Sequence, residues 1–264
     1  MKTLTCNIRF LGARDGDNGW THRRDLCARV IASRSPDLIC LQETWGPQLD
    51  DLTAALPDFA HFGIVDEPLG ANPVNTILYR RDAFDLLSQG GYWLSATPHV
   101  TGSSSWDSAC VRLANWLRLR QRGTGAELRV VNTHLDHVSQ AAREGQARVL
   151  VEDAAAYPDD YPQLLTGDLN CAAGNAAIDV LRAGGWRDTW AAVHGDADPG
   201  LTFHGFEGPA CSANHGKIDW IFSRGAVRVT GAEIIDDSDG DRYPSDHYFV
   251  GADVELEPNA ETAA

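Results

Sequence analysis

The sequence contains very little lysine and carries a strong excess of acid. Lysine occurs only at Lys2 and Lys217, and the formal net charge is −15 at pH 7. Such a field repels nucleic acid at long range, so the composition disfavours a protein that binds polyanions in general. It still permits a local basic pocket for a single phosphate group.

Several other features are missing. No window of about 18 consecutive apolar residues occurs, so no membrane span is predicted. The opening stretch MKTLTCNIRF has no apolar core of the secretory type, and we therefore expect a cytoplasmic protein. The six cysteines form no CxxC pair, which argues against a structural zinc site. No feature predicts a protein partner.

What remains is an alternation of short apolar runs and amphipathic stretches over 264 residues, 43% of them hydrophobic. That is enough material for a sizeable core. No internal repeat, low-complexity segment or flexible linker divides the chain. We therefore predict one α/β domain over residues 1–256, with two packed sheets and helices outside them, followed by a frayed tail over 257–264.

The periodicity of the apolar residues predicts the elements of this domain. Strands are expected over residues 3–9, 37–43, 74–80, 84–88, 111–121, 127–135, 162–170, 217–222, 226–235 and 247–256. Helices are expected over residues 20–34, 47–56, 138–155 and 175–183.

Polar side chains stand at or near the ends of several predicted core strands. They are Asn7, Glu43, His134, Asp168, Asn170, Asp219, Asp246 and His247. An unpaired charge is costly to bury in a core, so isolated carboxylates at these positions would be unfavourable. The cost becomes acceptable if the strand ends converge on one mouth, where the side chains share a metal ion and hydrogen-bond one another.

The stretch LLTGDLN illustrates this pattern. Asp168 and Asn170 are two positions apart, so an extended backbone would place both on one face and turn Leu169 toward the core. The carboxylate can orient or deprotonate a water molecule, and the carboxamide can donate to a phosphoryl oxygen. The alternative is an Asx-turn before a helix, because DLNCAAGN also contains capping residues.

The motifs LQE, NTHLDH, GDLN, KIDWIF and SDH follow one another in this order along the chain. Together they resemble the DNase I-like endonuclease/exonuclease/phosphatase superfamily. The segments YWLSATP, NTHLDHVSQ, TFHGF and DGDRYPSDH resemble its bacterial phosphoesterase-type members. Each motif alone is common, whereas the ordered set over nearly the whole chain is specific. The resemblance implies a four-layer α/β sandwich with two mixed β-sheets flanked by helices.

The resemblance also implies roles for individual residues. Glu43 would bind Mg²⁺, or Mn²⁺ in its place, with support from Asn7 and Asp246. Asp219 would orient His247, which would stabilise the charge that develops on phosphorus.

Further positions carry weaker implications. His134 would contact the scissile phosphate or protonate the leaving oxygen. Substrate-binding roles are implied for Arg112, Asn115, Phe203, His204 and Lys217. Simpler interpretations stay open for two of these, an edge-strand arginine at Arg112 and a surface lysine at Lys217.

The leading functional hypothesis is a metal-dependent phosphoesterase whose substrate is a small phosphorylated molecule: a sugar, a nucleotide or a lipid head group. A water molecule held by Asp168 would attack in line. The second hypothesis is a nuclease that cleaves DNA or RNA, which the acidic charge disfavours. The third is a non-catalytic binding protein, which the loss of a metal-binding glutamate or a histidine would support.

Overall fold

The computed structural model describes residues 1–65, 70, 72, 74–213 and 215–256. Two mixed six-stranded sheets form its centre. In spatial order, the first sheet consists of β11 (Val227–Ile235), β12 (Phe249–Leu256), β1 (Lys2–Asn7), β2 (Leu38–Gln42), β4 (Ile77–Arg80) and β3 (Phe59–Phe62). The second sheet consists of β5 (Phe84–Trp93), β6 (Leu113–Gln121), β7 (Glu127–His134), β8 (Gln163–Asp168), β10 (Asp219–Arg224) and β9 (Arg187–Asp188).

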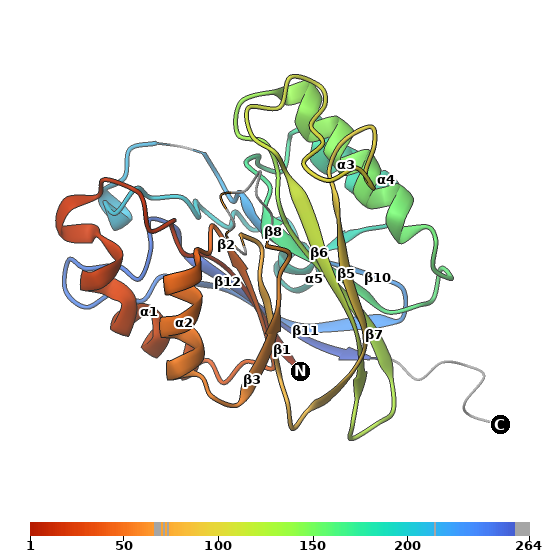
Figure 1. Ribbon diagram of the computed structural model, residues 1–264, viewed down its shortest axis with the longest axis horizontal. Helices are drawn as coiled ribbons and strands as arrows, with labels where there is room; N and C mark the ends of the chain where they lie inside the picture. The colour runs from red at the N-terminus through yellow and green to blue at the C-terminus, as the bar shows by residue number, and fades with distance from the viewer. Residues whose placement is uncertain (66–69, 71, 73, 214, 257–264) are drawn as a thin grey trace.

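Helices cover the outer faces of both sheets. The first sheet is covered by α1 (Trp20–Ser33) and α2 (Gly46–Ala55), and the second by α3 (Gln140–Ala154) and α4 (Ala176–Ala183) (Figure 1). Shorter helices are η1 (Gly16–Asn18), α5 (Thr189–His194) and η3 (Gly208–Ala210). The predicted α/β sandwich with two packed mixed sheets is therefore confirmed.

Three apolar clusters lie between the four layers. The two faces of strand β2 belong to two of these clusters. Ile39 and Leu41 pack into the cluster shared with α1 and α2. Leu38 and Cys40 pack into the cluster between the two sheets. A strand that is buried on both faces has no reason to alternate polar and apolar residues, which explains the continuous run LICL.

Each sheet contains a parallel pair at its centre, and these pairs place the polar strand ends. Strands β1 and β2 are parallel, as are β7 and β8, where His134 lies opposite Asp168. Strand β10 runs antiparallel to β8 and begins at Asp219, again opposite Asp168. Because ligands bind where the carboxyl ends of parallel strands meet, the register predicts one site at this edge.

Amide and hydroxyl groups connect the two sheets directly beneath that edge. The Nε2 of Gln42 donates to Oδ1 of Asn132 over 2.7 Å and to Oγ1 of Thr5 over 2.9 Å. Oγ1 of Thr166 donates to the same Asn132 oxygen over 3.2 Å. These groups are fully buried, so the hydrogen bonds fix how the two sheets lie against each other.

Most predicted elements are confirmed within a few residues, and the differences have local causes. Strand β5 continues to Trp93, beyond the predicted range of 84–88. Gly90 and Gly91 break the apolar pattern there, but the Trp116 ring fills the space that a side chain at Gly90 would occupy. The short elements β3, β9 and α5, each of six residues or fewer, are not among the predicted ones.

Two further expectations concern the C-terminal tail and a membrane span. The expected tail, residues 257–264, lies outside the described residues. Within the described ranges, none of the helices has the length and apolar character needed to cross a membrane.

Gly167 provides a test of how tightly β7 and β8 are packed. Its φ is +152°, and a Cβ would lie 2.2 Å from the backbone oxygen of Thr133. We expect Gly167→Ala to lower the free energy of unfolding by about 2–4 kcal/mol in urea titrations. Gly174→Ala, where a Cβ meets nothing within 4 Å, is the control and should stay within about 0.5 kcal/mol. Equal effects of the two substitutions would contradict the packing argument.

Candidate active site

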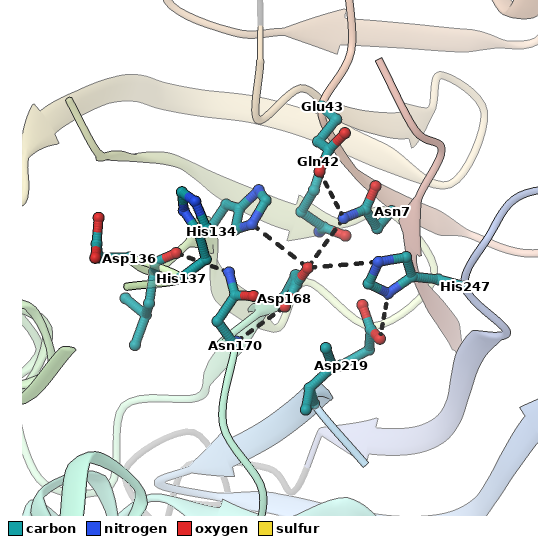
Figure 2. A network of polar contacts seen from close by, with 12 residues as sticks. Asn7, Gln42, Glu43, His134, Asp136, His137, Asp168, Asn170, Asp219 and His247 are labelled. Carbon is teal, nitrogen blue, oxygen red and sulfur yellow. Dashed lines mark hydrogen bonds and ion pairs between the residues drawn. The ribbon is translucent and has the colours of Figure 1, made fainter. Parts of the chain in front are cut away.

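The strand ends border a cleft of about 920 Å³. Six of the eight polar residues predicted at strand ends line it: Glu43, His134, Asp168, Asn170, Asp246 and His247. The other two, Asn7 and Asp219, are buried and bind the lining residues from behind. Figure 2 shows how these side chains, apart from that of Asp246, come from both sheets and gather around Asp168. The structure thus brings together the residues that the sequence pattern singled out.

Asp168 is the centre of the group. Its Oδ2 accepts a hydrogen bond from Nδ2 of Asn7 over 3.0 Å. The Nε2 atoms of His134 and His247 lie 3.4 Å and 3.8 Å from the same oxygen. One carboxylate oxygen therefore faces an amide and two imidazoles, a crowded position that suits an acid–base group.

Asp219 and His247 form a closely coupled pair. His247 Nδ1 lies 2.9 Å from Oδ2 of Asp219. Burial by itself lowers the pKa of His247, but the charges of Asp219, Asp246 and Asp168 outweigh it and raise that pKa to about 10. His247 is consequently an imidazolium at neutral pH, with its other nitrogen directed toward Asp168 (Figure 2).

The pKa of Asp168 is shifted in the opposite sense to that of an ordinary paired carboxylate. Burial, and then the charge of Asp219, raise it from 3.8 to about 7, while the charge of His247 acts against this rise. A carboxyl group with a pKa near 7 is present in both its protonated and its ionised form at neutral pH, so it can act as an acid or as a base.

His134 differs from His247 in its charge. Burial, followed by the positive charge of Arg112, lowers the pKa of His134 well below 6.5. The imidazole is therefore neutral at pH 7, so one ring nitrogen can donate a hydrogen bond while the other accepts one. The cleft holds one charged and one neutral imidazole, and their environments set the difference.

Asn170 reaches the cleft by a different route from the one predicted. Strand β8 ends at Asp168, and Asn170 adopts a left-handed conformation with φ of +50°. Its backbone N–H donates to Oδ1 of Asp168 over 2.9 Å, and its Nδ2 donates to the Leu135 carbonyl over 3.0 Å. The expectation of extended backbone is wrong here, because the side chain of Asp168 closes an Asx-turn. Asn170 nevertheless lines the cleft.

Glu43 stands just past β2 with a left-handed φ of +61°. Its Oε1 accepts from Nδ2 of Asn7 over 3.2 Å, and its Oε2 accepts from the backbone N–H of Phe10 over 3.0 Å. Asn7 donates to Glu43 and Asp168 through one nitrogen, while its Oδ1 accepts from the backbone N–H of Arg9. Asn7 therefore bridges two carboxylates, and strain at Glu43 is of the kind found at functional sites.

Asp246 lies on the same side of the cleft. Its Oδ2 is 3.5 Å from Nε of Arg9, and its Oδ1 accepts from the hydroxyl of Ser245. Arg9 also binds Asp15 through two nitrogens. Asp246 and Arg9 thus bring one negative and one positive group to the lining.

The acidic residues can hold a cation. Among the described residues, ligand atoms of Asp168, Asp219 and His247 lie within 4.8 Å of one another. A protonated imidazole offers no lone pair, however, and Nδ1 of His247 is already bound to Asp219. The carboxylate oxygens of Glu43, which the Asn7 amide and the Phe10 N–H hold in place, are the better donors, since hard divalent cations prefer oxygen.

Two predicted substrate-binding residues line the cleft. Nη2 of Arg112 lies 3.3 Å from Nδ1 of His137, another lining residue. The ring of Phe203 packs edge-on against His247, with 5.0 Å between the centroids. Arg112 can meet a ligand, whereas Phe203 also holds the charged imidazole in place.

Lys217 lies away from the lining. It is 3% exposed, and its Nζ binds Oδ1 of Asp188 over 3.1 Å and lies 3.3 Å from the centre of the Trp220 ring. Burial lowers its pKa to about 8. The interpretation as a surface lysine is therefore wrong, because the ammonium is enclosed.

His204 and Asn115 are fully buried and are also absent from the lining. His204 stacks on the ring of Tyr248 at 4.2 Å. Asn115 binds backbone groups of Ile64 and Asn75. Both residues support segments that border the cleft.

The segment TFHGF contains a residue that the sequence did not single out. Oγ1 of Thr202 accepts from the backbone N–H groups of Ile218 (2.9 Å) and Asp219 (3.2 Å). Its carbonyl accepts from the N–H of Tyr248 over 2.7 Å. Thr202 therefore ties the start of β10 to the residue after His247, and it sets the spacing of the Asp219–His247 pair.

Arg23 has a similar role on the other side. It is 1% exposed and donates to four backbone carbonyls, those of Ile8, Arg9, Asn18 and Pro244. The carbonyls of Ile8, Arg9 and Pro244 belong to the loops that follow Asn7 and precede Asp246. Nothing in the local sequence distinguishes Arg23 from its neighbour Arg24, so only the structure reveals this contact.

The fold and the site together define a class of protein, and comparison with known proteins identifies it. The sequence profile described as the Endonuclease/Exonuclease/phosphatase family matches residues 4–247. The chain belongs to this family.

Solved structures of bacterial proteins are similar over nearly the full chain. An endonuclease/exonuclease/phosphatase from Bacteroides vulgatus is 30% identical, with a TM-score of 0.87 and coverage of 97% of this chain and 98% of that one. A mannosyl-6-phosphatase from Bacteroides thetaiotaomicron is 26% identical, with a TM-score of 0.86 and coverage of 97% and 100%.

A curated relative is a longer protein. Nocturnin from Drosophila melanogaster is 28% identical over an alignment of 291 positions, which covers 92% of this chain but 43% of that protein. The chain thus spans less than half the length of this relative.

Thr202 provides a test of positioning. We expect Thr202→Val to lower kcat at least about tenfold with a smaller change in KM, because two buried N–H groups at the start of β10 lose their acceptor. Thr202→Ser should restore kcat. Thr189→Val removes a hydroxyl that donates to the Ile221 carbonyl of the same strand, and it should reduce stability without this loss of turnover. A similar fall in kcat for Thr189→Val would refute the specific role of Thr202.

Proposed function

We propose that this protein is a divalent-metal-dependent phosphoesterase that hydrolyses a phosphate ester of a small molecule by in-line attack of water. The observation that carries the proposal is the position of Asp168. Its carboxylate faces His134, His247 and Asn7 at the edge of a cleft, and Asp219 holds His247 from behind. Family membership supports the same reaction class.

In this proposal, Asp168 orients the attacking water and accepts its proton. His247, as an imidazolium, donates to a phosphoryl oxygen and stabilises the charge that grows there. Asn170 borders the same space and adds a donor. Neutral His134 holds a proton near the leaving oxygen. No covalent intermediate is required, so preorganised donors supply most of the rate enhancement.

Glu43 would hold the cation, with Asp246 on the same side of the cleft and Asn7 between Glu43 and Asp168, so the carboxylate of Asp168 stays free to accept the proton. Mg²⁺ or Mn²⁺ would supply positive charge that polarises the phosphoryl group when bound. Glu43 needs no large movement for this role, because Asn7 and Phe10 already fix its two oxygens.

The charge of the chain supports a small substrate. A net charge of −15 opposes the approach of a long nucleic acid, whereas Arg9 and Arg112 give the cleft local positive charge. The similarity to a mannosyl-6-phosphatase points in the same direction. Cytoplasmic location is part of this proposal.

The central test combines metal removal with substitution. We expect EDTA to abolish hydrolysis of a generic phosphate ester and Mg²⁺ or Mn²⁺ to restore it. Asp168→Asn and His247→Ala should each lower kcat by about 10²–10⁴-fold with little change in the circular dichroism spectrum. Glu43→Gln should raise the metal concentration needed for half-maximal activity.

Two results would count against the proposal. Normal turnover by Asp168→Asn or His247→Ala would remove the mechanism. Rapid cleavage of plasmid DNA or single-stranded RNA, with no hydrolysis of small esters across a range of salt concentrations, would favour the nuclease hypothesis instead.

The pH profile tests the role of Asp219. Activity that needs the His247 imidazolium is present below its pKa of about 10 and is lost as the pH rises through that value. Asp219→Asn removes the largest charge that raises this pKa, and it also removes a charge that raises the pKa of Asp168. The acid limb, where Asp168 must lose its proton, and the alkaline limb, where His247 must keep its proton, should therefore both move to lower pH. Asp188→Asn, which removes a carboxylate paired with Lys217, is the control and should leave the limbs in place.

A further inference from the structure

An aromatic wall stands beside the acidic centre of the cleft. It consists of Phe10, in the loop after β1, and Trp45, two residues past Glu43; both line the cleft. Their ring centroids are 5.8 Å apart and the planes are inclined by 36°. Neither ring is required for the chemistry at phosphorus, so the wall calls for a separate explanation.

The wall is held in place by buried contacts. Oε1 of Gln48 accepts from the backbone N–H groups of Leu11 and Trp45, each over 3.1 Å, and its Nε2 donates to the Arg9 carbonyl over 2.8 Å. Gly12 packs against the indole, where a Cβ would come within 2.7 Å of the ring. These contacts preorganise the wall before any ligand arrives, which lowers the entropic cost of binding.

Asn75 lines the cleft next to this wall and carries an unsatisfied acceptor. It is 2% exposed, and its Nδ2 donates to the Leu113 carbonyl over 2.9 Å. Its Oδ1 is buried with no hydrogen-bond partner in the described part of the chain. The N–H of Thr44 donates to the Val74 carbonyl, so the backbone joins Asn75 to the segment of Trp45. A buried carbonyl oxygen without a partner is unfavourable until a donor satisfies it.

We propose that Phe10, Trp45 and Asn75 form a subsite for a hydroxylated sugar ring that carries the phosphate ester. A sugar ring presents an apolar C–H face to an aromatic side chain, and a hydroxyl on its edge can donate to Oδ1 of Asn75. The phosphate would reach the centre at Asp168 and His247, so this inference rests on the proposed function for the chemistry. A free monosaccharide phosphate and the ribose of a nucleotide share this ring chemistry.

The experiment compares ring-bearing and acyclic esters. We would measure kcat/KM for mannose 6-phosphate, adenosine 5′-monophosphate and glycerol 3-phosphate in the wild type, Trp45→Leu and Trp190→Leu. Trp190 is absent from the cleft lining, so it controls for loss of a tryptophan elsewhere. In Trp45→Leu, the preference for a ring-bearing ester over glycerol 3-phosphate should fall at least about tenfold. In Trp190→Leu it should not change.

Calorimetric titration of the same proteins without added metal separates this inference from the proposed function. Weaker binding of a ring-bearing ester to Trp45→Leu, with no hydrolysis by any variant, would support the subsite and refute the phosphoesterase. Hydrolysis with the preference unchanged in Trp45→Leu would refute the subsite alone. An effect confined to mannose 6-phosphate would assign a free monosaccharide phosphate, and one confined to adenosine 5′-monophosphate would indicate stacking of the adenine base on Trp45 and would refute the sugar-ring subsite.

Discussion

The hydrogen bond between Gln42 and Asn132 is the contact on which the site depends. It joins the two sheets one residue before Glu43 and two residues before His134. A small shift between the sheets would separate the carboxylate of Glu43 from Asp168, and the single Asn7 nitrogen that reaches both would lose one of them. Buried amides are costly if left unpaired, so they specify one relative position where apolar residues would permit several.

The surroundings of each side chain in the cleft decide whether it is charged. Three buried carboxylates raise the pKa of His247, whereas burial and a nearby arginine keep His134 neutral. Asp168 lies between these two imidazoles and titrates near pH 7. One fold thus provides a cationic donor, a neutral imidazole and a titratable carboxylate within a few ångströms, groups that are suited to acid–base and electrostatic catalysis.

The sequence predicted the layers and the convergence of strand ends because apolar periodicity and terminal polar residues are local signals. It could not predict contacts that depend on distant segments. Lys217 was expected either to bind substrate or to lie on the surface, yet Asp188 and Trp220 enclose it away from the cleft lining. Asn170 looked extended, yet the side chain of Asp168 turns the backbone. The roles of Thr202 and Arg23 arise from backbone groups of remote loops, which no spacing of residue types encodes.

The parallel pairs also have a consequence for the opposite edge of the molecule. Strand β7 begins at Glu127 and ends at His134, so the turn between β6 and β7 is about a strand length from the cleft. A side chain at Gly123 in that turn would meet no atom within 4 Å. The cleft and the turn that can accept added groups therefore lie at opposite ends of the same strands. The turn is thus the natural place for an inserted peptide, a label or a fused domain.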